Sequence, residues 1–221
     1  IFLSNRLGLG DSFETGQSMT LGIDFVKEKI NKTNNEFTEI EDYFDFKLAT
    51  VFRFKEEDKL PINSTLNKKT SNIFGQLNYK PNETMSLNYK FSLKNDLNTL
   101  EYNSISPKFD FGNFSTEFNY LEERGVIGNT NLIENTTIYN FNEENSLSFK
   151  TRRNRKLNLT EYYDLIYEYK NDCLVASIDY KKRYYKDSDI KPSEELFFTI
   201  TIIPFTTFQT ESFSPDRLIL K

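Results

Sequence analysis

Apolar and polar residues alternate with a period of two along most of the chain. The segment Thr84–Lys94 shows the alternation most clearly, because serine, asparagine and lysine occupy the positions between its apolar residues, which are Met85, Leu87, Tyr89, Phe91 and Leu93. This period is typical of a β-strand that has one apolar and one polar face. No helical period of about 3.6 residues persists over a long window, so the pattern predicts an all-β protein.

The alternation, divided by turn signals, predicts about eleven strands, most of about ten residues. Tilted strands of ~9–11 residues are long enough to cross a bilayer. We therefore expect an antiparallel, up-and-down transmembrane β-barrel. The expected strands are Gln17–Glu28, Phe37–Lys55, Ser71–Lys80, Thr84–Lys94, Asn98–Phe109, Asn113–Glu123, Leu132–Asn142, Ser146–Arg155, Tyr162–Lys170, Leu174–Tyr184 and Glu195–Pro204.

The connections alternate between short turns and longer loops, as in barrels with short periplasmic turns and longer outer loops. If the last strand ends in the periplasm, the short turns at Pro81–Glu83, Asp110–Gly112, Glu143–Asn145 and Asn171–Cys173 are periplasmic. The loops at Glu56–Thr70, Arg124–Asn131, Lys156–Glu161 and Tyr185–Glu194 then lie outside, together with one short connection, Asn95–Leu97.

The composition agrees with a membrane barrel. Only 37% of the residues are hydrophobic, yet the chain contains 21 phenylalanines and 13 tyrosines. Because only alternate strand residues of a barrel face lipid, a low overall hydropathy is compatible with a membrane. The sequence contains no run of ~18 apolar residues, so no transmembrane helix is expected. The sequence starts at Ile1 without a signal peptide, so we expect either a removed leader or a fragment of a longer protein.

Tyrosines gather near strand ends in the last third of the chain. Membrane barrels carry aromatic girdles at both interfaces, and we interpret this cluster as a girdle rather than a binding stack. Its members are Tyr162, Tyr163, Tyr167, Tyr169, Tyr184 and Tyr185.

Charge and chemistry exclude several classes of function. The net charge is −5, and no basic face interleaved with aromatic residues is present, which argues against nucleic-acid binding. The chain has no histidine and one cysteine, which disfavours catalytic triads and zinc sites. We expect no catalytic residues, no cofactor and no metal. The carboxylates of Asp164 and Glu168 share a strand face and are interpreted as solvated, lumen-facing charges.

Two C-terminal segments carry a resemblance to a known family. The sequences EYYDLIYEYKNDCLVASIDYKKRYY (Glu161–Tyr185) and EELFFTITIIPF (Glu194–Phe205) resemble the C-terminal end of the LptD family, the lipopolysaccharide-assembly proteins of Gram-negative outer membranes. The similarity is closest to the alphaproteobacterial branch. It continues upstream through Phe149–Tyr163, Phe74–Leu93 and Ser4–Asp24, and so covers nearly the whole chain.

The resemblance implies an architecture and a function. The LptD family builds a barrel of twenty-six strands behind an N-terminal periplasmic domain, so residues 1–205 would be the C-terminal part of such a barrel and residues 206–221 a periplasmic tail. The barrel would insert lipopolysaccharide into the outer leaflet, with an LptE-type plug lipoprotein and an LptA-type periplasmic bridge protein as partners. A passive porin or receptor barrel and a soluble all-β adhesin module are the alternatives.

Basic side chains are candidate contacts for lipopolysaccharide in such a barrel. Lys90, Lys94, Lys150 and Arg152 are expected to face the lumen, where they either meet anionic sugars and phosphates or only keep the lumen hydrated. The dense basic run Lys150–Lys156 allows the same two interpretations.

Pro204 and Cys173 complete the candidate residues. Pro204 lacks a backbone donor, so it either weakens a seam at the last strand or simply ends that strand. Cys173 lies in a turn assigned to the oxidising periplasm, and an odd cysteine in an exported protein suggests pairing beyond the visible chain. The resemblance implies a disulfide to a cysteine near the N-terminus of the longer protein. Other members carry two adjacent cysteines here, whereas Asp172 precedes Cys173, so at most one bond can form.

Overall fold

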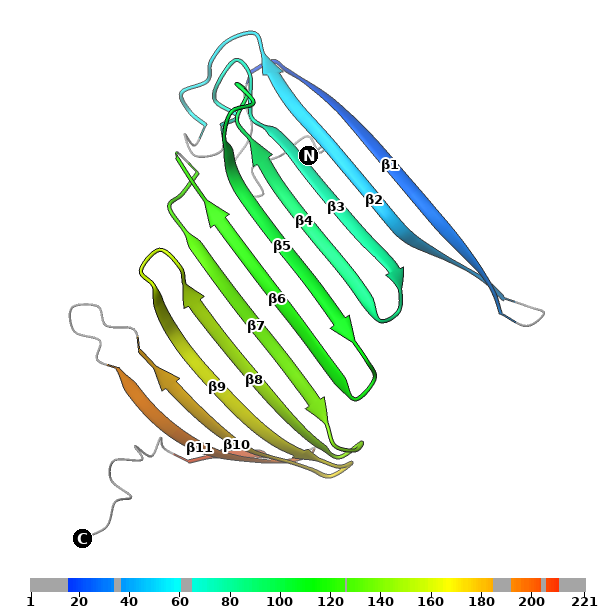
Figure 1. Cartoon of the computed structure of the whole chain (residues 1–221), viewed down its shortest axis with the longest axis vertical. Coiled ribbons are helices and arrows are strands. Elements are labelled where there is room, and N and C mark those ends of the chain that lie inside the picture. Colours follow the sequence, from blue (N-terminus) through cyan, green and yellow to red (C-terminus); the bar gives the residue numbers. More distant parts are fainter. Residues whose placement is uncertain are drawn as a thin grey trace. The chain divides into compact units, whose positions relative to one another are not determined.

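The computed structural model describes residues 16–33, 37–60, 65–125, 127–184, 192–203 and 206–210. Within these residues all regular structure is β, and twelve antiparallel strands follow one another in one up-and-down sheet (Figure 1). The predicted all-β class and strand order are thereby confirmed. The sheet is not closed, because no described pairing joins its first strand to its last. Among the described residues, no helix is long and apolar enough to span a membrane.

Eleven of the strands correspond to the predicted ones, with ends that differ by a few residues. The strands are β1 (Ser18–Thr33), β2 (Phe37–Arg53), β3 (Ile73–Asn82), β4 (Met85–Leu93), β5 (Leu100–Asp110), β6 (Phe114–Glu123), β7 (Asn131–Asn140), β8 (Asn145–Asn154), β9 (Leu159–Lys170), β10 (Leu174–Arg183), β11 (Ser193–Ile202) and β12 (Thr206–Gln209). The largest difference is in β1, which continues past the predicted end at Glu28.

The twelfth strand is a difference from the prediction of about eleven. Strand β12 pairs with β11 over Thr199–Ile202. The strand predicted at Glu195–Pro204 is therefore followed by one more strand. The segment expected as a tail, residues 206–221, begins with these four paired residues. A four-residue strand is too short to show an alternation in the sequence. Pro204 itself lies outside the described residues, so its expected seam role stays a prediction.

The described contacts divide the chain into two compact units. The first contains Ile1–Pro107 and Tyr120–Asn131, and the second contains Lys108–Asn119 and Leu132–Lys221. In the first unit, cross-strand register places apolar residues of β1–β4 on one face. One row of partners along this face is Phe25, Phe46, Leu77 and Tyr89, and the next row is Ile23, Leu48, Gly75 and Phe91.

Strands β1 and β2 are longer than their neighbours. The β2–β3 pairing covers only Phe44–Ala49, so beyond Phe44 the two strands continue as a two-stranded ribbon (Figure 1). The ribbon starts at a β-bulge, where the register shifts between Lys27 and Glu28 and Tyr43 becomes the extra residue. A bulge bends the strand and increases its twist, which turns the ribbon at the end of the sheet.

Few hydrophobic side chains are buried. Within the described residues only Ala49, Val51, Leu60 and Leu66 are buried, and three of them cluster with the partly buried Phe74 where the connection between β2 and β3 folds onto the polar face. Hydrogen bonds fix this connection to β4 and β5. The side-chain amide of Asn72 donates to Ser92 Oγ at 3.0 Å and to Glu101 Oε2 at 2.6 Å. The first unit therefore has a small local core instead of a continuous one.

The second unit has the same two-faced sheet. On one face, Tyr167 of β9, Ile178 of β10 and Phe198 of β11 form a cross-strand row of exposed aromatic and apolar residues. Ile200 of β11 is 46% exposed on the same face. Polar and charged residues occupy most of the alternate positions on the other face, and Ile166, Val175 and Phe197 lie among them. An apolar surface without a covering layer is therefore a property of both units.

The apolar face of the first unit contains one close approach that requires glycine. A Cβ atom at Gly75 would lie 2.2 Å from two ring carbons of Phe91, which stacks on Tyr89 with ring centroids 5.4 Å apart. We expect Gly75→Ala to displace this ring and to lower the free energy of unfolding by about 1–3 kcal/mol, the usual effect of overpacking. Urea unfolding of the protein in lipid vesicles measures the change.

A double-mutant cycle gives the control for this prediction. In a Phe91→Ala background the extra methyl group meets open space, so Gly75→Ala should then cost less than half as much. An equal cost in both backgrounds would show that the effect comes from the backbone and not from the ring.

Candidate functional site

The candidate site lies on the polar face of the second unit. Cross-strand register aligns Glu134 of β7, Arg152 of β8, Tyr162 of β9 and Arg183 of β10 in one row. Two residues further along these strands, Lys150, Asp164 and Lys181 form the next row. Strict alternation in each strand puts both rows on one face, which explains why residues far apart in sequence gather here.

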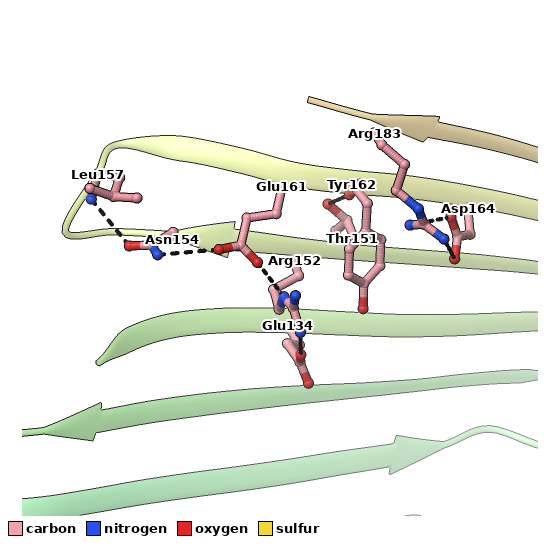
Figure 2. A network of polar contacts seen from close by, with 9 residues as sticks. All are labelled: Glu134, Thr151, Arg152, Asn154, Leu157, Glu161, Tyr162, Asp164 and Arg183. Atoms are coloured by element: carbon pink, nitrogen blue, oxygen red, sulfur yellow. Dashed lines mark hydrogen bonds and ion pairs between the residues drawn. The ribbon is translucent and has the colours of Figure 1, made fainter. Parts of the chain in front are cut away.

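A β-bulge brings a buried carboxylate into the first row. Arg152 pairs with Tyr162 but Arg153 pairs with Thr160, so Glu161 is the extra residue on β9. Bulges re-aim side chains in this way. Glu161 is only 8% exposed, and Arg152 Nε donates to its Oε2 at 2.5 Å (Figure 2). Arg152 Nη1 also lies 3.5 Å from Glu134 Oε1, so two carboxylates fix one guanidinium.

The neighbouring turn helps to position Glu161. Asn154 Nδ2 donates to Glu161 Oε1 at 3.2 Å, and Asn154 Oδ1 accepts from the backbone N–H of Leu157 at 3.1 Å (Figure 2). The carboxylate is therefore tied to the conformation of the connection between β8 and β9.

The second arginine is held in a similar way. Arg183 Nη1 lies 2.9 Å from Asp164 Oδ1, and Nη2 donates to Oδ2 at 3.4 Å. The guanidinium carbons of Arg152 and Arg183 lie 5.2 Å and 4.8 Å from the centroid of the Tyr162 ring. Cation–π attraction to one ring therefore adds to the ion pairs and fixes both guanidinium groups around Tyr162 (Figure 2).

These residues line a cavity of about 610 Å³. Its walls are Arg152, Glu161, Tyr162, Asp164 and Arg183, so N–H donors and carboxylate acceptors stand side by side. Such a surface can bind a polar ligand through several hydrogen bonds. Within the described residues, no group of three or more cysteine, aspartate or glutamate side chains is placed to hold a metal ion.

The four predicted basic contacts are divided between the two units. Lys150 and Arg152 lie together on the polar face of β8, and Lys150 is exposed. Lys90 is exposed on the polar face of β4, opposite Gln76. Lys94 lies just beyond β4 and forms an ion pair with Asp96 at 3.0 Å. Arg152 and Lys94 thus have charge partners within the chain, whereas Lys90 and Lys150 make no ion pair with any described residue.

The Lys94–Asp96 pair is reinforced by a turn. The backbone N–H of Asn98 donates to Asp96, and together with Lys94 it holds the pKa of the Asp96 carboxyl below its ordinary value. The hydrogen bond with Asp96 raises the pKa of Lys94. Both groups therefore stay charged throughout the neutral pH range, so the carboxylate competes with any anionic ligand for Lys94.

Sequence reasoning missed part of this site. Tyr162 was expected in an aromatic girdle but lies on the polar face between two arginines, while Tyr163 lies on the apolar face against Tyr184, with ring centroids 5.8 Å apart. Asp164 was expected as a solvated charge but is the partner of Arg183. Counting alternate positions separates Tyr162 from Tyr163, but the bulge at Glu161 has no signal in the sequence.

Cys173 occupies an exposed turn position with a free thiol. Asn171 Oδ1 accepts from the backbone N–H groups of Cys173 at 3.0 Å and Leu174 at 2.8 Å, and this closes the hairpin between β9 and β10. The predicted short turn is therefore present, and the thiol is accessible to another polypeptide segment.

No protein-family model matches the chain, and no curated protein matches it.

The contact between Arg152 and Glu161 predicts a stability effect. In Arg152→Gln the buried carboxylate loses its cation, and we expect the free energy of unfolding to fall by about 1–3 kcal/mol, the usual cost of a polar group left without its partner. Urea unfolding in lipid vesicles measures this. Adding Glu161→Gln to the same protein should recover most of the loss, because an amide needs no cation.

Lys150→Gln is the matched control on the same strand and face. An exposed lysine without an ion pair should change stability by no more than about 0.5 kcal/mol. If Arg152→Gln is as mild as Lys150→Gln, the ion pairs around Glu161 contribute nothing to the fold.

Proposed function

We propose that this chain is a membrane-spanning part of an outer-membrane β-barrel, with its apolar sheet face against lipid and its polar face lining a hydrated lumen. The observation that carries the proposal is the distribution of apolar side chains. Four are buried within the described residues, whereas large apolar residues such as Ile23, 59% exposed, and Phe25, 52% exposed, cover one face.

A water-soluble alternative conflicts with this distribution. Soluble proteins bury most of their large apolar side chains and rarely expose wide apolar patches. In a barrel the outward side chains contact lipid, so they need no second layer of protein. An adhesin-like module in water would need another element to cover both apolar faces.

Lipopolysaccharide assembly is the function that we propose for the barrel. The resemblance of Glu161–Tyr185 and Glu194–Phe205 to the LptD family motivates it. The charged groups around Arg152 and Arg183, close to the loops assigned to the outside, support it because guanidinium donors beside carboxylate acceptors suit the sugar-bearing part of such a ligand. An LptE-type plug lipoprotein and an LptA-type bridge protein would be the partners, and Cys173 would form a disulfide with another segment of the longer protein.

A passive porin or receptor barrel is the second candidate. The paired charges around Arg152 also suit a wall that only keeps a pore hydrated, because Arg152 and Arg183 are each already paired with a carboxylate. The two functions differ in what the cell loses when the protein is removed, and this difference decides between them.

The membrane assignment predicts that neighbouring positions along β10 alternate between contact with lipid and contact with water. Nitroxide labels attached one at a time from Leu174 to Lys182, in a Cys173→Ser background in lipid vesicles, should contact molecular oxygen at Ile178 and the other even positions. They should contact a water-soluble nickel complex at Ser177 and the other odd positions. The control series Asn171–Asp172, in the turn, should contact the nickel complex throughout. Equal accessibility on both faces would exclude a lipid-facing surface.

The assembly function predicts a specific defect. Depletion of the protein in its native bacterium should reduce newly made lipopolysaccharide at the cell surface, as measured by surface labelling, before the uptake of small solutes changes. A passive pore would give the reverse order, with slower solute uptake and normal surface lipopolysaccharide.

A further inference from the structure

The cavity around Tyr162 combines hydrogen-bond donors with acceptors in nearly equal number. In the two rows that surround it, the cations are Arg152, Arg183, Lys150 and Lys181, and the carboxylates are Glu134, Glu161, Asp164 and Glu195. Because these charges balance, the surface has no net positive potential that would favour a simple anion. It suits a ligand whose groups both donate and accept hydrogen bonds.

The guanidinium groups still have donors to offer. Arg152 uses Nε and Nη1 in its ion pairs, and Arg183 uses Nη1 and Nη2. Among the described contacts this leaves Nη2 of Arg152 and Nε of Arg183 for a ligand. Both groups are already fixed by carboxylates and by the Tyr162 ring, so a ligand loses little side-chain entropy when it binds them.

The acceptors are also in place. Glu161 is buried beneath the row and Asp164 adjoins it, so their carboxylate oxygens lie beside the donors. The hollow that these residues line is open to solvent and has a volume of about 610 Å³, so a ligand unit of small-molecule size can reach the donors and the acceptors together. Because both arginines already contact the Tyr162 ring, we assign Tyr162 the role of holding them rather than of stacking on a ligand.

We propose that Arg152, Glu161, Asp164 and Arg183 bind a saccharide unit, with Tyr162 as a positioning residue. Sugar hydroxyls accept from the guanidinium N–H groups and donate to the carboxylates, so one class of ligand satisfies both halves of the site. The inference rests on the proposed function for the source of the sugar, which in a lipopolysaccharide carrier is the carbohydrate core of the lipid.

The test uses a lipid-free probe. Core oligosaccharide released from lipopolysaccharide is titrated into the complete protein in detergent micelles, and saturation-transfer NMR reports the bound protons. We expect binding by the wild type, with an affinity at least about tenfold lower in Arg183→Gln and in Asp164→Asn. Lys170→Gln is the matched control, because Lys170 lies on the same face of β9, about 20 Å along the strand from Asp164 at ~3.3 Å per residue.

Several outcomes would overturn the saccharide site. One is that the wild type shows no binding at about 10 mM probe, which corresponds to a negligible affinity. Another is that Arg183→Gln binds as well as the wild type while circular dichroism shows an intact β-sheet. Displacement of the oligosaccharide by inorganic phosphate at equal concentration would instead identify a phosphate site. A failure of the proposed assembly function gives a different result: depletion would leave surface lipopolysaccharide unchanged, while the purified protein would still bind the oligosaccharide.

Discussion

The hydrogen-bonded ladder between neighbouring strands is the interaction on which the rest of this structure depends. Four hydrophobic side chains are buried in the described residues, which is far too little apolar burial to hold a sheet of twelve strands. Where no water competes for the peptide groups, every unmade backbone hydrogen bond is costly, so paired strands are strongly favoured. The ladder sets the register, and the register then decides which side chains meet on each face.

The polar face shows what this register produces. Arg152 meets Tyr162 and Glu134 because their strands pair in one alignment, and a shift of β8 by one residue would move Arg152 to the apolar side, away from both partners. The bulge at Glu161 is a local exception to the regular pattern, and it supplies the carboxylate that the arginine needs. The arrangement on this face therefore depends on one inserted residue as much as on the strands themselves.

The sequence carried most of the strand pattern, because alternation and turn residues are local signals. Asn171 closes a turn with its own side chain, and Thr84–Lys94 alternates without interruption, so both could be recognised from the chain alone. Strand β12 could not be recognised, because four residues acquire their structure only from pairing with β11. The partners of Arg152 were equally hidden, since they depend on which residues oppose each other across strands and on the bulge beside them.

The ribbon formed by the far halves of β1 and β2 has a mechanical consequence. Beyond Phe44 it has no β3 beside it, and two-stranded ribbons twist more strongly than wide sheets. With seven residues from Phe37 to Tyr43 at ~3.3 Å each, it forms an arm of about 20 Å that begins at the bulge beside Lys27. A small torsion at the bulge would move the tip by several ångströms without breaking any hydrogen bond between β2 and β3, so the ribbon can change direction while the sheet keeps its register.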